Sequence, residues 1–322
     1  MQPYQPLVES GHWLTILSNF WPRPLDTTQF PLLETVYQTE PDVRVLVREH
    51  HPQGTPKGEI ILVHGLEGSS ESGYMRSFAH YACTAGWRVH RTNIRTCGPT
   101  EDWCKTLYHA GLTSDLKFIV RELARQGRGP LYIIGYSLGG NQVLKATAEL
   151  SDESPGIIAG ACSVCTPIDL ALCSRKIEHP SNFIYMNRFL RSMKARLRRR
   201  SAMFPGAFSL HDLDEVRTIW QIDNQVTARH FGFGTAENYY STQSAGVHID
   251  RVKTPTMMVA AEDDPIVPID CYNNPVVTAN PNLKFVPVRR GGHVSFLSRT
   301  LPRFWLDHFL LEWLEQIGNK RG

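Results

Sequence analysis

The sequence lacks the long hydrophobic runs that membrane-spanning helices require. No window of its 322 residues approaches about 18 uninterrupted apolar residues, so no transmembrane helix is predicted. Residues 1–20 contain no basic stretch followed by a continuous apolar stretch, so a secretory signal is not expected. We therefore expect a soluble, cytoplasmic protein.

Cysteine is scarce and its spacing is irregular. The seven cysteines are an odd number scattered over the chain, which does not indicate a disulfide framework and fits a reducing compartment. Cys162 and Cys165 form a CxxC motif without a second pair nearby, so we interpret them as buried thiols and predict no metal site. The formal net charge of +3 is too small to indicate nucleic-acid binding.

Short apolar runs alternate with helical patterns along the chain. The candidate strands are residues 59–63, 87–94, 131–136, 156–161, 256–260 and 284–288. Near-continuous apolar strands between helices indicate an α/β fold with a parallel sheet covered on both faces. We expect an antiparallel edge strand at 43–48 and an amphipathic helix at 304–314 that docks on the sheet.

Residues 167–248 interrupt the alternation of strand and helix patterns. The segment is rich in aromatic and basic residues, shows no strand period and falls between two core strands. We interpret it as a cap inserted into one domain that spans residues 1–322. Residues 1–40 are interpreted as an N-terminal extension that packs on the core.

The segment GYSLGG, residues 135–140, follows the apolar run 131–134 and precedes a helical pattern. A serine in GxSxG between a strand and a helix is typical of a nucleophile elbow, because the glycines permit a sharp turn that exposes the hydroxyl of Ser137. The amide of Leu138, at the start of the helix, is then a candidate oxyanion donor. The alternative interpretation is a tight turn with an incidental serine.

A carboxylate and a histidine follow in the chain order that this arrangement requires. Asp264 comes after the candidate strand 256–260, and His293 comes after the strand 284–288. The carboxyl ends of parallel strands meet at one edge of a sheet, so we expect Ser137, His293 and Asp264 to form a catalytic triad.

The choice of acid rests on the local turn. Asp264 begins the run Asp-Pro-Ile-Val-Pro, which resembles the common Asp-x-x-Val-Pro turn in which the first residue orients the histidine. Asp263 and Glu262 are the alternatives.

The loop after the candidate strand 59–63 reads His64-Gly65-Leu66. We expect Gly65 to let the backbone turn inward and the amide of Leu66 to be the second oxyanion donor. His64 is interpreted as a structural residue of this loop.

Together these motifs resemble the α/β-hydrolase superfamily, and specifically its YheT-like branch. The similarity covers roughly residues 40–315. The motifs that carry it are HGLEGSSESGY (64–74), NIRTCG (93–98), LYHAGLTSD (107–115), GYSLGGN (135–141) and GGHVSF (291–296). The resemblance implies an eight-stranded, mostly parallel sheet, a cap between strands six and seven, and carboxylester hydrolysis without a cofactor. Thr96 departs from the Arg-Gly-Cys that many members have, which puts the local turn in doubt but not the catalytic set.

The function predicted from these residues is a serine hydrolase that cleaves short- to medium-chain or lipid-like esters through an acyl-enzyme. Alternatives are a catalytically silent scaffold that binds a ligand or partner, and a thioesterase or phospholipase with a membrane-surface substrate. A serine at the elbow disfavours dehalogenases and epoxide hydrolases, which use an aspartate there.

Aromatic residues near the serine and in the cap are the candidates for substrate binding: Tyr136, Phe183, Tyr185 and Phe189. The cap residues could line an acyl pocket, or they could only pack the cap onto the sheet.

Seven basic residues fall between positions 188 and 200: Arg188, Arg191, Lys194, Arg196, Arg198, Arg199 and Arg200. We interpret them first as a solvated helix face and second as a contact with an anionic membrane surface. No basic–aromatic repeat supports nucleic acid as a partner. No pattern in the sequence predicts the oligomeric state.

Overall fold

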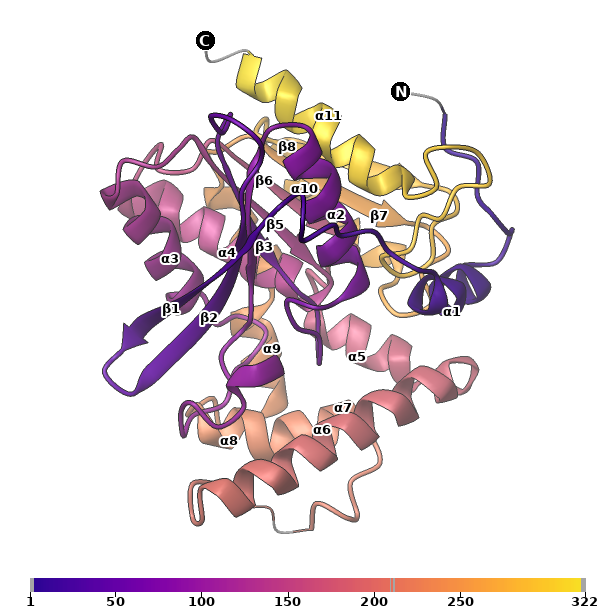
Figure 1. Cartoon of the computed structure of the whole chain (residues 1–322). Coiled ribbons are helices and arrows are strands. Elements are labelled where there is room, and N and C mark those ends of the chain that lie inside the picture. Colours follow the sequence, from indigo (N-terminus) through magenta and orange to yellow (C-terminus); the bar gives the residue numbers. More distant parts are fainter. Residues whose placement is uncertain (1–2, 209, 211, 320–322) are drawn as a thin grey trace.

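The centre of the molecule is an eight-stranded sheet. The structure is a computed structural model that describes residues 3–208, 210 and 212–319. The strands are β1 (Leu32–Glu40), β2 (Val43–His50), β3 (Glu59–Val63), β4 (Arg88–Thr92), β5 (Leu131–Tyr136), β6 (Gly160–Val164), β7 (Thr256–Ala261) and β8 (Leu283–Val288). Their order is β1-β2-β4-β3-β5-β6-β7-β8 (Figure 1). β2 is antiparallel to both neighbours, and the other pairs are parallel, which confirms the predicted fold class.

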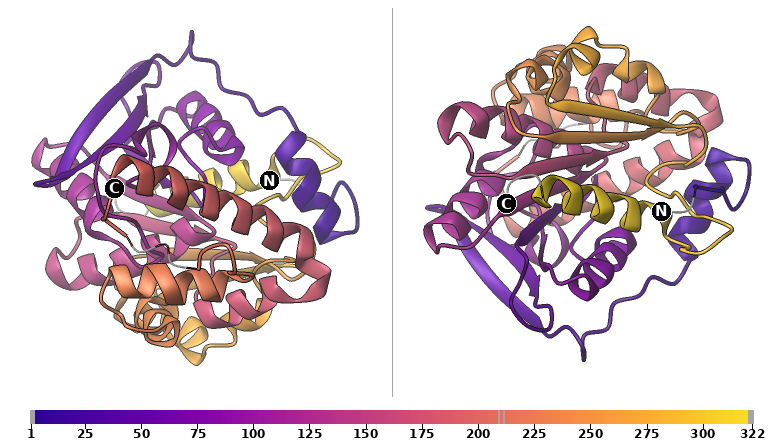
Figure 2. Two further views of the ribbon diagram at one scale, coloured as in Figure 1. Left: turned by 90° about the horizontal axis from the view of Figure 1, so that it is seen from below. Right: turned by 90° about the horizontal axis from the view of Figure 1, so that it is seen from above.

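Helices cover both faces of the sheet (Figures 1 and 2). They include α2 (Gly73–Thr84) and α11 (Trp305–Asn319) on one face, α3 (Ser114–Arg125) and α4 (Leu138–Glu153) on the other, and α10 (Pro275–Ala279) beside β8. Side chains alternate between the faces, so Ile60 and Leu62 of β3 enter one core while Ile61 and Val63 enter the other. In the part of the chain that the structure describes, no helix is both long and apolar enough to cross a bilayer.

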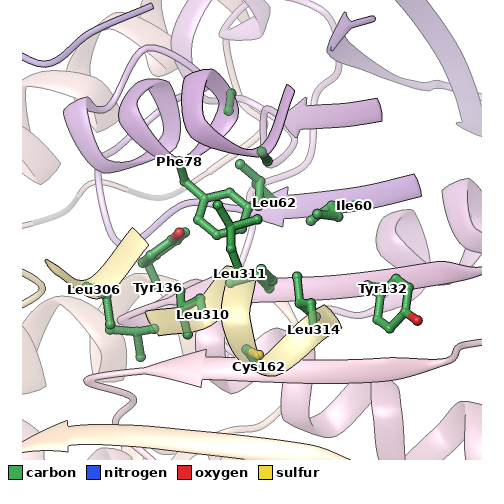
Figure 3. Close-up of a cluster of buried hydrophobic side chains, with 14 of the residues drawn as sticks. Ile60, Leu62, Phe78, Tyr132, Tyr136, Cys162, Leu306, Leu310, Leu311 and Leu314 are labelled. Atoms are coloured by element: carbon green, nitrogen blue, oxygen red, sulfur yellow. The ribbon is translucent and has the colours of Figure 1, made fainter. Parts of the chain in front are cut away.

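The first core lies between the sheet and helices α2 and α11 (Figure 3). Phe78 of α2, Leu62 of β3, and Leu310 and Leu314 of α11 belong to this cluster, and all four side chains are fully buried. This packing fixes the last helix on the sheet, as the amphipathic pattern of 304–314 predicts.

The helices between β6 and β7 form a layer over the carboxyl edge of the sheet (Figure 1). They are α5 (Leu170–Glu178), α6 (Phe183–Met203), α7 (Ile219–Ile222), α8 (Ala228–His230) and α9 (Ala236–Gln243), and a π-helix (Asp223–Thr227) joins α7 to α8. Leu190, Met193 and Leu197 of α6 pack with Ile219 and Ile222 of α7 in a separate apolar cluster. The cap therefore has a small core of its own.

The antiparallel edge differs from the sequence prediction. β1 occupies the edge, and β2, which was expected there, lies between β1 and β4. Most side chains of β1 are at least partly exposed and only Tyr37 is buried, so no apolar alternation marks this strand in the sequence. Residues 1–40 thus contribute a strand of the sheet as well as helix α1 (Gly11–Phe20).

The strand expected at 156–161 begins later, as β6 at Gly160. Gly156 has a φ of 79°, a left-handed conformation that places it in the preceding turn. The apolar run therefore spans a turn and only the start of a strand.

The structure agrees with the prediction that the cysteines are buried thiols without disulfide bonds. All seven are free and buried. Burial raises the pKa of Cys162 and Cys165 well above the usual value for a thiol, which keeps both protonated.

Asp307 is a buried acid in the first turn of α11. Its Oδ2 has no hydrogen-bond partner among the described residues. Burial raises the pKa of Asp307 from 3.8 to about 6, although Arg23 and Ser77 act in the opposite direction. The folded protein therefore holds this proton more tightly than the unfolded chain does.

The Asp307→Asn variant should be more stable than the wild type at neutral pH. The stabilising contribution of the protonated acid is complete below its unfolded pKa of 3.8 and is lost as the pH rises through about 6. We expect the difference in unfolding free energy between variant and wild type to grow by roughly 3 kcal/mol from about pH 4 to about pH 7. Urea unfolding of both proteins across this range measures it, and a difference independent of pH would contradict the assignment.

Candidate active site

The serine turn lies where β5 ends and α4 begins. Ser137 has φ 54° and ψ −124°, a strained backbone conformation that suits an exposed nucleophile. A Cβ atom on Gly135 would lie 2.3 Å from the carbonyl oxygen of Gly139, and one on Gly139 would lie 2.3 Å from that of His64. Both positions require glycine because strand, helix and neighbouring loop touch through their backbones.

Ser137 also lies at the point where the strand order reverses. β3 and β5 are neighbours, but the chain continues from β3 to β4 on one side and from β5 to β6 on the other. The loops that follow such strands diverge and leave a crevice, which is the usual ligand site of open α/β sheets.

Ser137, His293 and Asp264 come from three separate loops and form a hydrogen-bonded chain. The distance from Ser137 Oγ to His293 Nε2 is 2.9 Å, and that from His293 Nδ1 to Asp264 Oδ2 is 2.8 Å. When Nδ1–H donates to the carboxylate, Nε2 keeps its lone pair and accepts the hydroxyl proton of Ser137. The structure thus brings together the three side chains that the sequence nominates.

The two adjacent aspartates have different partners. The other oxygen of Asp264, Oδ1, accepts hydrogen bonds from the amides of Ile266 and Val267, at 2.8 and 3.0 Å. Oδ1 of Asp263 accepts instead from the amides of Gly291 and Gly292, at 2.8 and 3.0 Å. Asp264 therefore orients the imidazole, whereas Asp263 holds the loop that precedes it. Glu262 is exposed.

The loop after β3 passes close to the serine. A Cβ atom on Gly65 would lie 3.0 Å from Cβ of Ser137. Leu66 and Leu138, the two expected oxyanion donors, both line the cavity beside Ser137. Within the described chain, neither of their amides donates a hydrogen bond to another protein group. Both amides are therefore free to bind a substrate oxygen.

His64 holds this loop in place. The amide of Ile94 donates to its Nε2 at 3.1 Å, and its Nδ1 donates to the carbonyl oxygen of Gly65 at 2.8 Å. Burial lowers the pKa of His64 to about 4, so the ring stays neutral. The structural role predicted for His64 is confirmed.

A buried ion pair connects the cap to the same loop. Arg196 of α6 lies 2.8 Å from Glu67, and each side chain is only 11% exposed. Ser192, one turn earlier on α6, donates to the other carboxylate oxygen of Glu67 at 2.6 Å. The guanidinium also lies 4.7 Å from the ring centre of Tyr108. Arg196 was predicted to lie on a solvated basic face of the helix. Its three-residue spacing from Met193, which is buried, was the signal in the sequence that could have indicated its burial.

Two cavities meet at Ser137. A cavity of about 120 Å³ lies under the cap, and its largely apolar lining includes Leu170, Ile177, Met193 and Ile219. We call it the acyl cavity after the group that we propose occupies it. The entrance cavity, of about 380 Å³, lies between α1 and α6, and its more polar lining includes Ser18, Arg23, Ser72 and Arg188. Leu66, Phe189 and Ile266 line both, so a molecule at Ser137 can extend in two chemically different directions.

One carboxyl group interrupts the apolar lining. Asp223, in the π-helix of the cap, accepts hydrogen bonds from the hydroxyl groups of Thr227 at 2.8 Å and Tyr240 at 2.6 Å. Burial raises the pKa of Asp223 to about 6, although both hydroxyl groups act in the opposite direction. Above that pH, the ionised carboxylate would repel a negatively charged group in this part of the cavity.

Two of the four residues expected to bind substrate lie elsewhere. Tyr136 is fully buried in the first core against Tyr74, with ring centres 4.6 Å apart, because its strand position points away from the cap (Figure 3). Phe183 is 62% exposed on the outer side of α6. Tyr185 lines the entrance cavity and Phe189 lines both cavities.

Two of the triad side chains, together with one cysteine, have the composition of a metal site. One ligand atom each from Cys165, Asp264 and His293 lies within 4.8 Å of the others. Metal binding would require the thiolate of Cys165, but burial raises the pKa of this thiol well above its usual value. Asp264 and His293 already bond each other, so the set fits proton transfer better than metal ligation.

Helix α1 supports the histidine loop, which the sequence analysis does not predict. The amide of His293 donates to Thr15 Oγ1 at 2.8 Å, and Ser295 Oγ donates to the carbonyl oxygen of Leu14 at 2.7 Å. A Cβ atom on Gly11 would lie 1.9 Å from the carbonyl oxygen of Asp263, so this helix touches the backbone of the acidic turn. Nearly the whole chain separates these partners, and no local pattern indicates the contact.

Comparisons with known proteins agree with this architecture. The family described as the alpha/beta hydrolase fold matches residues 59–300. YheT of Escherichia coli, described as a candidate esterase, is 32% identical over 83% of this chain and 79% of its own length. A monoacylglycerol lipase of Saccharomyces cerevisiae is 28% identical over 80% of this chain, which spans 59% of that protein.

Solved structures give the same picture of the fold. The esterase Pf2001 of Pyrococcus furiosus superposes with a TM-score of 0.55 at 17% identity, covering 92% of this chain and 96% of its own. From the family match over residues 59–300 and the similarity to YheT, the chain belongs to the α/β-hydrolase family and to its YheT-like branch.

Proposed function

We propose that the protein is a serine hydrolase that cleaves carboxylic esters through an acyl-enzyme intermediate. The single observation that carries the proposal is the hydrogen-bonded chain from Ser137 through His293 to the buried Asp264. A serine hydroxyl is a weak nucleophile, and an adjacent imidazole held by a carboxylate is what activates it.

In the first half of the reaction, Ser137 Oγ attacks the ester carbonyl while His293 Nε2 takes its proton. Asp264 keeps the imidazole in the required tautomer and stabilises the imidazolium that forms. The amides of Leu66 and Leu138 bind the oxyanion of the tetrahedral intermediate. His293 then protonates the departing alcohol, which leaves the acyl group on Ser137.

In the second half, water replaces the alcohol. His293 Nε2 removes a proton from the water, which attacks the acyl-enzyme, and the collapse of the second intermediate returns the proton to Ser137. Every group in this cycle is a side chain or amide of the protein, so the proposed reaction needs no cofactor.

The proposed substrate is a short- to medium-chain or lipid-like ester. The apolar lining of the acyl cavity supports an acyl group there, and the more polar entrance cavity suits the alcohol. The name of the yeast relative, a monoacylglycerol lipase, agrees with such a substrate.

The Ser137→Ala variant should lose at least about 10⁴-fold in ester turnover, as expected when the nucleophile of a triad is removed. A fluorophosphonate probe should label the wild type at Ser137 and leave the variant unlabelled. Replacing Ser241, an exposed serine of α9, by alanine is the control and should change neither readout. If Ser137→Ala keeps wild-type turnover, the assignment is wrong. A wild type that is neither labelled nor active would favour a silent binding scaffold.

The Arg196→Met variant should lower kcat by about 10- to 100-fold with little change in KM, because the loop that carries the Leu66 amide loses its ion pair with the cap. Amide hydrogen exchange in residues 66–68 should become faster at the same time. Arg199→Met is the matched control, since Arg199 lies on the same helix in an exposed pair with Glu101. An equal effect of both variants, or a change in KM alone, would contradict the positioning role.

The Ile219→Trp variant should shorten the preferred acyl chain. A larger side chain in the lining of the acyl cavity removes space for distal methylene groups, each of which is worth about 1–3 kcal/mol of discrimination. Turnover of p-nitrophenyl esters from acetate to palmitate measures this. We expect kcat/KM for octanoate to fall by roughly tenfold or more relative to acetate. An unchanged chain-length profile would place the acyl group elsewhere.

A further inference from the structure

The helix α6 has two contrasting faces. Leu190, Met193 and Leu197 face the interior of the cap and are buried. Phe183 and Ile184, at the start of the same helix, are 62% and 70% exposed. Large apolar side chains gathered at the surface mark an interaction site more often than isolated ones do.

Two arginines extend this apolar pair along the helix. Ile184, Arg188 and Arg191 follow each other at intervals of four and three residues, which places them on one face of α6. Phe183, Ile184, Arg188 and Arg191 also line one shallow groove. We call these four residues the docking face.

The arginines of the docking face differ from the other basic residues of α6. Arg196, Arg198 and Arg199 pair with Glu67, Asp214 and Glu101, and Lys194 and Arg200 donate to backbone carbonyl oxygens. Arg188 and Arg191 are exposed and, among the described residues, have neither an acidic partner nor a hydrogen bond. Of the seven positive charges, these two are therefore free for an external anion.

Helix α1 continues this surface. The ring of His12 stacks on Tyr185 at 5.7 Å, so α1 and the first turns of α6 lie side by side, as the view from below in Figure 2 shows. On α1, Trp13 and Phe20 are 60% and 81% exposed and stand seven residues apart, on one helix face. Exposed apolar side chains thus come from both helices that border the entrance cavity.

We propose that the docking face, together with Trp13 and Phe20, binds the surface of an anionic lipid bilayer. The aromatic and aliphatic side chains enter the boundary of the acyl chains, and Arg188 and Arg191 contact headgroup phosphates. Arg188 and Tyr185 also line the entrance cavity, so a lipid ester leaves the bilayer next to the path to Ser137.

Charge favours a bilayer over a second copy of the chain. In a two-fold symmetric dimer the same patch meets itself, so the unpaired arginines of both copies would face each other without acidic partners. An anionic surface matches both the free positive charge and the apolar side chains.

The test uses the full chain and sedimentation with vesicles of phosphatidylcholine, with and without phosphatidylglycerol. The wild type should bind the anionic vesicles, and binding should weaken with salt. Arg188→Gln with Arg191→Gln should weaken it by roughly 10- to 30-fold, as expected for two surface arginines. Phe183→Ser with Ile184→Ser should weaken binding at every salt concentration.

Arg198→Gln with Arg199→Gln is the matched control, because it removes the same charge from the same helix at paired positions. It should bind nearly as well as the wild type, and Ile184→Ser should hydrolyse a soluble ester as fast as the wild type does. If the two double arginine variants lost the same vesicle affinity, net charge alone would explain the binding, and the proposal would be overturned. Unchanged binding of the Phe183→Ser, Ile184→Ser variant would overturn it too. So would a wild-type dimer that this variant converts to monomer.

The Ser137→Ala variant separates this proposal from the proposed function. It should bind vesicles as the wild type does, because adsorption involves no chemistry at the serine. Loss of turnover with intact binding supports both proposals. Turnover without vesicle binding overturns only the docking face.

Discussion

The contact between backbones at the end of β5 is the constraint on which the site depends. Gly135 and Gly139 leave no side chain between β5, α4 and the loop after β3, so these three elements meet at van der Waals distance. That closeness forces Ser137 into its strained conformation and brings Leu66 and Leu138 to the same cavity. A strained residue persists only where its surroundings determine it, and here the two cores on either side of the sheet provide that rigidity.

Around this fixed point, the remaining groups are held by polar contacts with specific partners. Asp264 and Asp263 are neighbours in sequence, yet one orients an imidazole and the other holds the loop that carries it. On the cap side, Glu67 is bound by Arg196 and Ser192 of one helix. The cap is thus attached to the loop beside the serine, in addition to covering it.

The parts of this arrangement that the sequence predicts are those with local signals. The glycines around Ser137, the turn at Asp264 and most of the strands along the chain leave short patterns. Contacts between distant segments do not, as with Thr15 and His293. Tyr136 was misplaced because its strand is buried on both faces, so polarity does not indicate which side faces the cap. Arg196 was misplaced because a charged side chain is expected in solvent, whereas here Glu67 and the ring of Tyr108 compensate its burial.

The contact between α1 and the histidine loop has a consequence for biosynthesis. Thr15 is translated before the first strand of the sheet, and His293 is translated after the last strand, 278 positions later. The sheet can therefore begin to assemble around Ser137 during translation, whereas the imidazole of His293 is positioned only after its loop has been made and meets α1. The hydrogen-bonded chain from Ser137 to Asp264 is therefore completed late in biosynthesis, when the loop after β8 has folded against α1.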